Sequence, residues 1–114
     1  MPFIDIRTNT ELLPETTEVL KKELARALEA SFPGKTENWL MVSFRGGEDM
    51  FFAGKAEPCA MADVSVFGQQ AKKSYDKMTA AVTAVISQRC RISSDRIYVK
   101  YTEYDKWGWN GGNF

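Results

Sequence analysis

Residues 94–101, Ser-Asp-Arg-Ile-Tyr-Val-Lys-Tyr, predict a turn that leads into a strand with Ile97, Val99 and Tyr101 on one side. A similar passage, Thr-Glu-Asn-Trp-Leu-Met-Val, occupies residues 36–42. Each passage follows an amphipathic helical pattern, and each helical pattern follows a segment that is typical of a strand. The chain therefore repeats the order strand, helix, strand, which predicts two βαβ units.

The first unit begins with a strand at residues 3–8, where apolar and polar side chains alternate. An amphipathic helix follows from Pro14 and ends at residues 32–34, Phe-Pro-Gly. Residues 39–44, Trp-Leu-Met-Val-Ser-Phe, predict the second strand. Their largely apolar character indicates a central place in the sheet.

The second unit is predicted to contain a strand at residues 59–67, a helix from about residue 70 to residue 89, and a strand at residues 96–101. Residues 50–53, Met-Phe-Phe-Ala, predict a short edge strand before this unit. The tail, residues 107–114, is aromatic and rich in glycine.

These elements predict an α+β fold in a single domain over residues 1–114, with a four-stranded mixed sheet and two antiparallel helices on one face. The other face of the sheet stays uncovered, and we expect it to carry apolar and aromatic side chains. The three aromatic residues of the tail have no evident partner within the chain. We therefore expect a homo-oligomer in which the sheets face inward and the tail reaches a neighbour.

The composition excludes several function classes. Lysine plus arginine and aspartate plus glutamate number 15 each, so no basic excess favours binding to nucleic acid or to an anionic membrane. A ferredoxin-like RNA-binding domain is disfavoured for the same reason, and because no motif combines aromatic and basic residues in the required way. The sequence contains no apolar run long enough for a membrane helix and no signal-peptide pattern, which predicts a cytoplasmic protein.

Metal and thiol chemistry are also disfavoured. The chain has no histidine, and its two cysteines, Cys59 and Cys90, are far apart in the sequence. No metal site is predicted, and a thiol paired with a histidine is excluded. Both cysteines are interpreted as small buried hydrophobic residues.

Pro2 allows two interpretations. Proline has a fixed φ and no amide proton, so removal of Met1 would leave a rigid secondary amine at the start of a strand, where it can act as a base. The alternative is that Pro2 simply begins an edge strand.

Several segments together resemble the family of macrophage migration inhibitory factor and D-dopachrome tautomerase, within the tautomerase superfamily. They occur in the family's order and span nearly the whole chain. They are Met1-Pro2, Gly34-Lys35, Glu57-Pro58-Cys59-Ala60, Ser93-Ser94-Asp95-Arg96-Ile97-Tyr98, and Gly108-Trp109-Asn110 with Phe114.

The resemblance implies a homotrimer of βαββαβ subunits, with active sites at the subunit interfaces and Pro2 as the catalytic base. An ordinary α-amino group titrates at about 7.7 to 8.0, so the site must lower this pKa. Lys35 matches a family lysine in the pocket, where it lowers the pKa of Pro2 and holds the carboxylate of the substrate. The alternative for Lys35 is a solvated charge near the end of a helix.

The resemblance also implies a set of substrate-binding residues. Phe67 matches a position whose backbone N–H contacts ligand, and its large ring should narrow the pocket unless it is a core aromatic at a strand end. Tyr98 and Lys100 share one strand face and belong to the site of the neighbouring subunit. Lys100 replaces the usual asparagine. It either strengthens carboxylate binding and lowers the pKa of Pro2 further, or pairs with an acid on the next subunit.

Three further aromatic residues match positions at or near the rim of the pocket, namely Trp39, Trp109 and Phe114. For Trp109 and Phe114 the alternative is packing of the tail across a subunit interface. Some family members carry two cysteines after the Glu-Pro segment, whereas Cys59 here is followed by Ala60, Met61 and Ala62. A dithiol oxidoreductase activity is therefore not expected.

The function implied by the resemblance is keto–enol tautomerisation of a small anionic aromatic keto acid, of the phenylpyruvate type or similar to dopachrome, without a cofactor. This activity requires removal of Met1. The alternative is a cytokine-like signalling protein that binds a receptor protein and in which the pocket is vestigial or secondary. Members of this kind are secreted without a signal peptide.

Overall fold

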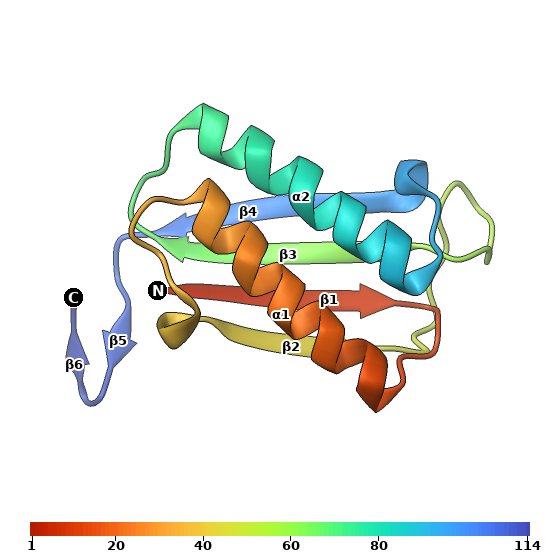
Figure 1. Ribbon diagram of the computed structural model, residues 1–114, viewed down its shortest axis with the longest axis horizontal. Coiled ribbons are helices and arrows are strands. Elements are labelled where there is room, and N and C mark those ends of the chain that lie inside the picture. The colour runs from red at the N-terminus through yellow and green to blue at the C-terminus, as the bar shows by residue number, and fades with distance from the viewer.

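The computed structural model describes residues 1–114 and contains a four-stranded sheet with two helices packed on one face (Figure 1). Two 3₁₀ turns, η1 (Glu37–Trp39) and η2 (Ser94–Arg96), precede the second strand of each βαβ unit. The main elements are β1 (Pro2–Thr8), α1 (Pro14–Ser31), β2 (Met41–Arg45), β3 (Ala60–Phe67), α2 (Lys72–Cys90) and β4 (Ile97–Tyr104).

The strand order is β2-β1-β3-β4. Strands β1 and β2 are parallel, as are β3 and β4, while β1 and β3 are antiparallel. Each parallel pair is joined by a helix, and Figure 1 shows the two helices running in opposite directions across the same face. The structure thus confirms the mixed sheet of two βαβ units and the layer of antiparallel helices.

The core lies between this helical layer and the sheet. The predicted stripe of α1 is fully buried at Leu20, Leu24 and Leu28, and α2 contributes buried side chains at regular helical spacing. The buried residues of α2 are Ser74, Met78, Val82, Ile86 and Cys90. The sheet supplies the alternate residues of its strands, such as Ile4 and Ile6 of β1.

The prediction for the second strand was wrong in its start and its position. β2 begins at Met41, because Trp39 belongs to η1, and β2 lies at an edge of the sheet. The apolar run does not reflect burial on both faces, because Leu40, Val42 and Phe44 pack against the core while Trp39 and Met41 are exposed. β1 takes the central place because it pairs with β2 on one side and with β3 on the other.

The edge strand predicted at residues 50–53 is also absent. Phe52 and Lys55 form a single bridge that closes a tight turn, with positive φ at Ala53 (54°) and Gly54 (75°). Positive φ at both central residues is the geometry of a type I′ turn. Residues 50–59 therefore form an ordered loop rather than a strand.

The C-terminal tail forms a small hairpin of β5 (Gly108–Trp109) and β6 (Gly112–Asn113), which the sequence did not predict. Its aromatic residues find partners in their own chain, contrary to the expectation that they have none. Trp107 packs against Tyr104 at 5.8 Å between ring centroids, and Phe114 lies 5.8 Å from Phe67.

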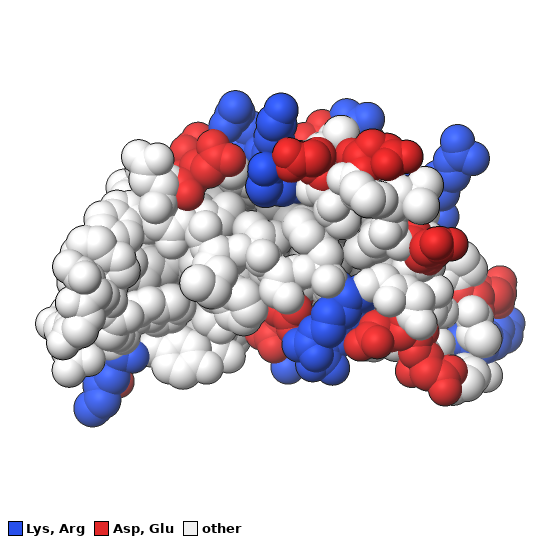
Figure 2. All heavy atoms as spheres, turned by 90° about the horizontal axis from the view of Figure 1, so that it is seen from below, with Lys and Arg blue, Asp and Glu red and all other residues white.

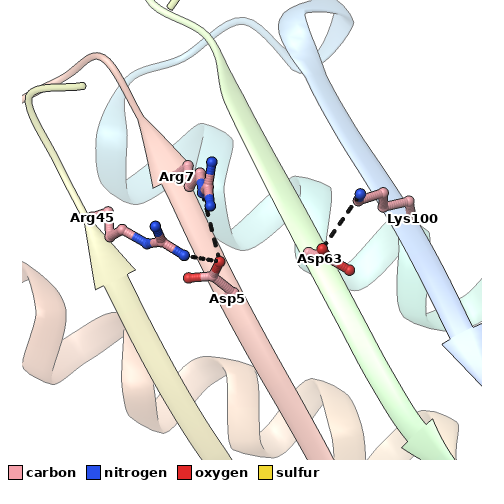
Figure 3. Close-up of polar contacts among 5 residues, drawn as sticks. All are labelled: Asp5, Arg7, Arg45, Asp63 and Lys100. Atoms are coloured by element: carbon pink, nitrogen blue, oxygen red, sulfur yellow. Dashed lines mark hydrogen bonds and ion pairs between the residues drawn. The ribbon is translucent and has the colours of Figure 1, made fainter. Parts of the chain in front are cut away.

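The uncovered face of the sheet is more polar than predicted. Strand alternation places Asp5 and Arg7 on this face, opposite the buried Ile4 and Ile6. Figure 3 shows ionic side chains from all four strands on the side of the sheet away from the helices. They are Asp5, Arg7, Arg45, Asp63 and Lys100, with nitrogen-to-oxygen distances of 3.7 Å for Arg7–Asp5, 2.8 Å for Arg45–Asp5 and 3.4 Å for Lys100–Asp63.

Neither helix is long and apolar enough to cross a membrane. Both cysteines are buried and unpaired, as predicted.

Candidate active site

The N-terminal end of β1 opens into a cavity of about 670 Å³. Pro2 is buried there, because β1 begins at Pro2 itself and pairs with Val66 of β3. Eight of the thirteen lining residues are hydrophobic, a composition suited to an aromatic ligand. Among the lining residues are Met1, Pro2, Phe3, Trp39, Met41, Tyr104, Lys106, Trp107 and Trp109.

Figure 2 shows this end of the molecule, at the left, as a largely uncharged surface. The charged side chains gather elsewhere, along the helical layer and toward the opposite end. A small anionic ligand that enters this region therefore meets few acidic side chains that repel it.

Lys35 lies at the same end of the molecule. A turn at Gly34 (φ 81°) follows α1, and the backbone N–H of Lys35 donates to the Phe32 carbonyl at 3.1 Å. The side chain then reaches across to β3, where Nζ donates to the Phe67 carbonyl oxygen at 3.3 Å. The Lys35 ammonium is thus held beside the chain terminus.

The amine at this site has a lowered pKa. With Met1 in place, the pKa of its amino group falls from 8.0 to about 6. Burial is the main cause, and the positive charge and hydrogen bond of Lys35 add to it. Both effects disfavour the protonated amine, so an amine here is largely unprotonated at neutral pH.

Met1 also accepts a hydrogen bond from a backbone N–H of β3. The Phe67 N–H donates to the Met1 carbonyl oxygen at 3.1 Å. While Met1 is present, the nitrogen of Pro2 belongs to a peptide bond and cannot accept a proton. Loss of Met1 would free both the Pro2 nitrogen and the Phe67 N–H at one place.

Aromatic rings extend from Phe67 to the hairpin. Phe67 lies beside Phe114, which stacks on Trp109 at 6.4 Å between centroids. Trp109 in turn makes an edge-to-face contact of 4.9 Å with Trp39. The structure therefore brings four of the five aromatic site residues named from the sequence into one cluster at the end of the sheet that holds Pro2.

Tyr98 and Lys100 lie away from Pro2 in the same chain. Tyr98 pairs in register with Met61 of β3. The β3 partner of Pro2 is Val66, which is five residues away from Met61 along the strand. Its side chain is 58% exposed and packs on Phe52 at 5.0 Å between centroids. Lys100 pairs with Asp63 of its own chain, an acid that neither interpretation of Lys100 included.

Sequence reasoning missed some residues of this region. Tyr104 and Trp107 line the cavity and contact each other, but nothing in the strand pattern indicated that β4 continues as far as Tyr104. Asp63 was missed as the partner of Lys100, although a prediction of the parallel register of β3 and β4 would have paired them. No group of three or more histidine, cysteine, aspartate or glutamate residues is placed to hold a metal ion.

The fold is that of a known class of proteins. The family model for macrophage migration inhibitory factor (MIF) matches residues 1–114. Among solved structures, MIF2 of Leishmania major superposes with a TM-score of 0.94 at 30% identity, covering 100% of this chain and 97% of that one. A macrophage migration inhibitory factor homologue from Prochlorococcus marinus gives a TM-score of 0.82 at 28% identity, with 98% of each chain covered.

Curated relatives agree with this assignment. The macrophage migration inhibitory factor of Meriones unguiculatus is 31% identical over 121 residues, covering 100% of this chain and 99% of the relative. D-dopachrome decarboxylase-B of Xenopus laevis is 26% identical over 114 residues, covering 97% and 95%. The chain belongs to the macrophage migration inhibitory factor family and has its tautomerase fold. Membership supports a function of the tautomerase or the cytokine-like type.

Proposed function

We propose that the protein, once Met1 is removed, is a cofactor-independent keto–enol tautomerase of phenylpyruvate-type α-keto acids. The observation that carries this proposal is the terminal amine in an aromatic-walled cavity beside Lys35, with its pKa lowered to about 6. Removal of Met1 would make the Pro2 nitrogen the terminal amine, one residue along from the Met1 amine, at the same end of β1 and near the same ammonium.

In the proposed reaction the neutral Pro2 nitrogen removes a proton from the carbon next to the keto group. The proton returns to the enol oxygen or, in the reverse direction, to the carbon. Lys35 and the freed Phe67 N–H stabilise the substrate carboxylate and the negative charge that develops on oxygen. The rings of Trp109 and Phe114 hold the aromatic part of the substrate.

We further propose that the active protein is a homotrimer in which Tyr98, and Lys100 on the same strand face, act at the site of the neighbouring subunit. Two observations support this arrangement. Both residues lie far along the sheet from Pro2 of their own chain. The outer edges of β2 and β4 are unpaired, and unpaired strand edges are ready to join another chain.

The test compares tautomerisation of phenylpyruvate by the Met1-free protein, by its Pro2→Gly variant and by a form that retains Met1. We expect full activity only in the first, since Pro2→Gly replaces the rigid secondary amine by a mobile primary one. Intact mass verifies the terminus of each sample. Equal activity of the Met1-free protein and Pro2→Gly would refute Pro2 as the base.

The second candidate function is signalling through a receptor protein, and the curated relatives named macrophage migration inhibitory factor favour it. It is tested by receptor binding of the Met1-free protein before and after covalent modification of Pro2. Binding that is unaffected by the modification would favour an interaction surface separate from the pocket.

A further inference from the structure

The segment Ser94-Asp95-Arg96 contains a residue that the proposed mechanism does not use. Arg96 ends η2, directly before β4, and lies two residues before Tyr98. Its guanidinium group contacts the loop at residues 50–59, which contacts Tyr98 in turn. These contacts connect the partly buried Arg96 cation to the exposed side chain of Tyr98.

The guanidinium group of Arg96 binds four carbonyl groups of the loop. Nε donates to Pro58 at 2.9 Å, and Nη1 donates to Phe52 at 3.3 Å. Nη2 donates to both Lys55 at 3.2 Å and Glu57 at 3.0 Å. A planar guanidinium can satisfy several fixed acceptors at once, whereas a lysine ammonium lacks this fork geometry.

The loop is held from its other side by Asn9, at the end of β1. The Asn9 amide donates to the carbonyls of Met50, Ala56 and Glu57, and its oxygen accepts from the Cys59 N–H at 2.9 Å. Within the loop, the backbones of Phe52 and Lys55 exchange two hydrogen bonds of 3.0 Å. Phe52 is therefore fixed in position by its backbone.

The ring of Phe52 links Arg96 to Tyr98. The Arg96 guanidinium carbon lies 5.2 Å from the centroid of this ring, within the range of a cation–π contact. The Tyr98 ring packs against Phe52 at 5.0 Å between centroids. Tyr98 is otherwise largely exposed, so its phenol depends on Phe52 for a defined orientation.

We infer that Arg96, acting through Phe52, positions Tyr98 for the site of the neighbouring subunit. Arg96 is a positioning residue, since it touches Tyr98 only through the Phe52 ring. This inference rests on the function proposed above. It assigns a role to the Glu57-Pro58 and Ser94-Asp95-Arg96 segments, which meet at the Arg96 side chain.

The first experiment measures the position of Tyr98 without reference to activity. The protein, labelled with 3-fluorotyrosine, carries four tyrosines, and Tyr98→Phe identifies the ¹⁹F resonance of Tyr98. Arg96→Lys should shift or broaden this resonance. The matched control is Arg89→Lys, because Arg89 is also held by hydrogen bonds, two of them to Glu23, but belongs to α2. An unchanged Tyr98 resonance in Arg96→Lys would overturn the inference.

The second experiment is a double-mutant cycle on the Met1-free protein with phenylpyruvate. Arg96→Lys should lower kcat/KM by about 10- to 100-fold, since small misplacements of a catalytic group are costly. In a Tyr98→Phe background the same change should cost less than about twofold, because the positioned hydroxyl is gone. Additive losses would overturn the inference, since they mean that Arg96 acts independently of Tyr98.

A second variant, and the combination of the resonance with the activity, distinguish failure of the positioning contact from failure of the proposed function. Phe52→Leu keeps the loop backbone and an apolar side chain, so it tests the same link if Arg96→Lys fails to fold. A Tyr98 resonance that moves in a protein without tautomerase activity supports the positioning contact and refutes the proposed function. An active protein with an unmoved Tyr98 resonance refutes the positioning contact alone.

Discussion

At the scale of single residues, Lys35 is the most consequential side chain of the candidate site. It follows α1 through a glycine turn, and its ammonium reaches the Phe67 carbonyl, beside the terminal amine. The positive charge of Lys35 beside the terminal amine disfavours protonation of that amine. A residue just after α1 thereby lowers the pKa of the terminal amine.

This link predicts the pH dependence of tautomerase activity. A base is active when unprotonated, and burial with the Lys35 charge lowers the pKa of an amine at this end of the chain, so kcat/KM should rise with pH through a midpoint below 8.0 and level off above it. Lys35→Met removes the ammonium, so the midpoint should move upward toward 8.0, the ordinary value. Lys22→Met, on the exposed surface of α1, serves as the control. A midpoint that is the same in all three proteins would contradict the role of Lys35.

A second residue-scale prediction concerns Gly46, at the end of β2. A Cβ atom at this position would lie 2.8 Å from the Leu12 backbone nitrogen, which cannot yield easily. Gly46→Ala should therefore lower the free energy of unfolding by about 1–3 kcal/mol. Urea denaturation measures this loss. Gly112→Ala, where the nearest atom is 4.0 Å away, should change stability by less than about 0.5 kcal/mol.

At the scale of elements, the β5–β6 hairpin is held to the sheet by aromatic contacts. Trp109 alone contacts both Trp39, in η1, and Phe114, at the chain end. Since the hairpin residues themselves are exposed, these contacts determine where the hairpin lies. The hairpin therefore forms one wall of the cavity, through Gly108 and Trp109.

This arrangement predicts a selective effect of Trp109→Ala on substrate binding. Loss of the contact between the Trp109 ring and the aromatic ring of the substrate should raise KM for phenylpyruvate by about fivefold. The effect on KM for an aliphatic α-keto acid should be smaller. Steady-state kinetics with both substrates measure the difference. The control is Leu13→Ala, which removes an exposed apolar side chain just before α1. Equal effects on both substrates would mean that Trp109 supports the fold rather than the ligand.

The elements also show how far sequence reasoning extends. The stripe of α1 was predictable because helical periodicity is a local property, as Leu20, Leu24 and Leu28 illustrate. The edge position of β2 was not, since an apolar run looks the same in edge and central strands. The contacts of Arg96 with the 50–59 loop join segments that only the folded chain brings together.

The candidate site, too, was predictable from the sequence only in part. Pro2, Lys35 and the aromatic residues were named by resemblance, and the structure brings them to one end of the sheet. The Lys100–Asp63 pair required the register of two parallel strands, which the sequence pattern does not encode.

At the scale of the whole molecule, the distance of Tyr98 from Pro2 within one chain predicts complementation between two subunit variants of reduced activity. Pro2→Gly and Tyr98→Phe proteins are unfolded together in equal amounts and refolded. In a trimer with sites shared between neighbours, about a quarter of the sites then combine an intact Pro2 with an intact Tyr98. Activity should rise above the mean of the two separate variants.

The controls for this experiment are each variant refolded alone and the two variants mixed without unfolding. Sites contained within one chain would give only the mean activity, because no chain carries both intact residues. Native mass spectrometry of the refolded sample reports the number of subunits independently of activity.

The hydrogen bond from Phe67 to the Met1 carbonyl has a consequence for biosynthesis. If Pro2 is the base, the first methionine works as a one-residue propeptide, and the ribosome releases a latent protein that an aminopeptidase switches on. Purification strategy is constrained as well. An affinity tag at the N-terminus would block the amine permanently, and one at the C-terminus would extend from Phe114, within the same aromatic cluster. Pro2 and Phe114 both lie at the candidate site, so a sequence fused next to either residue would disturb it.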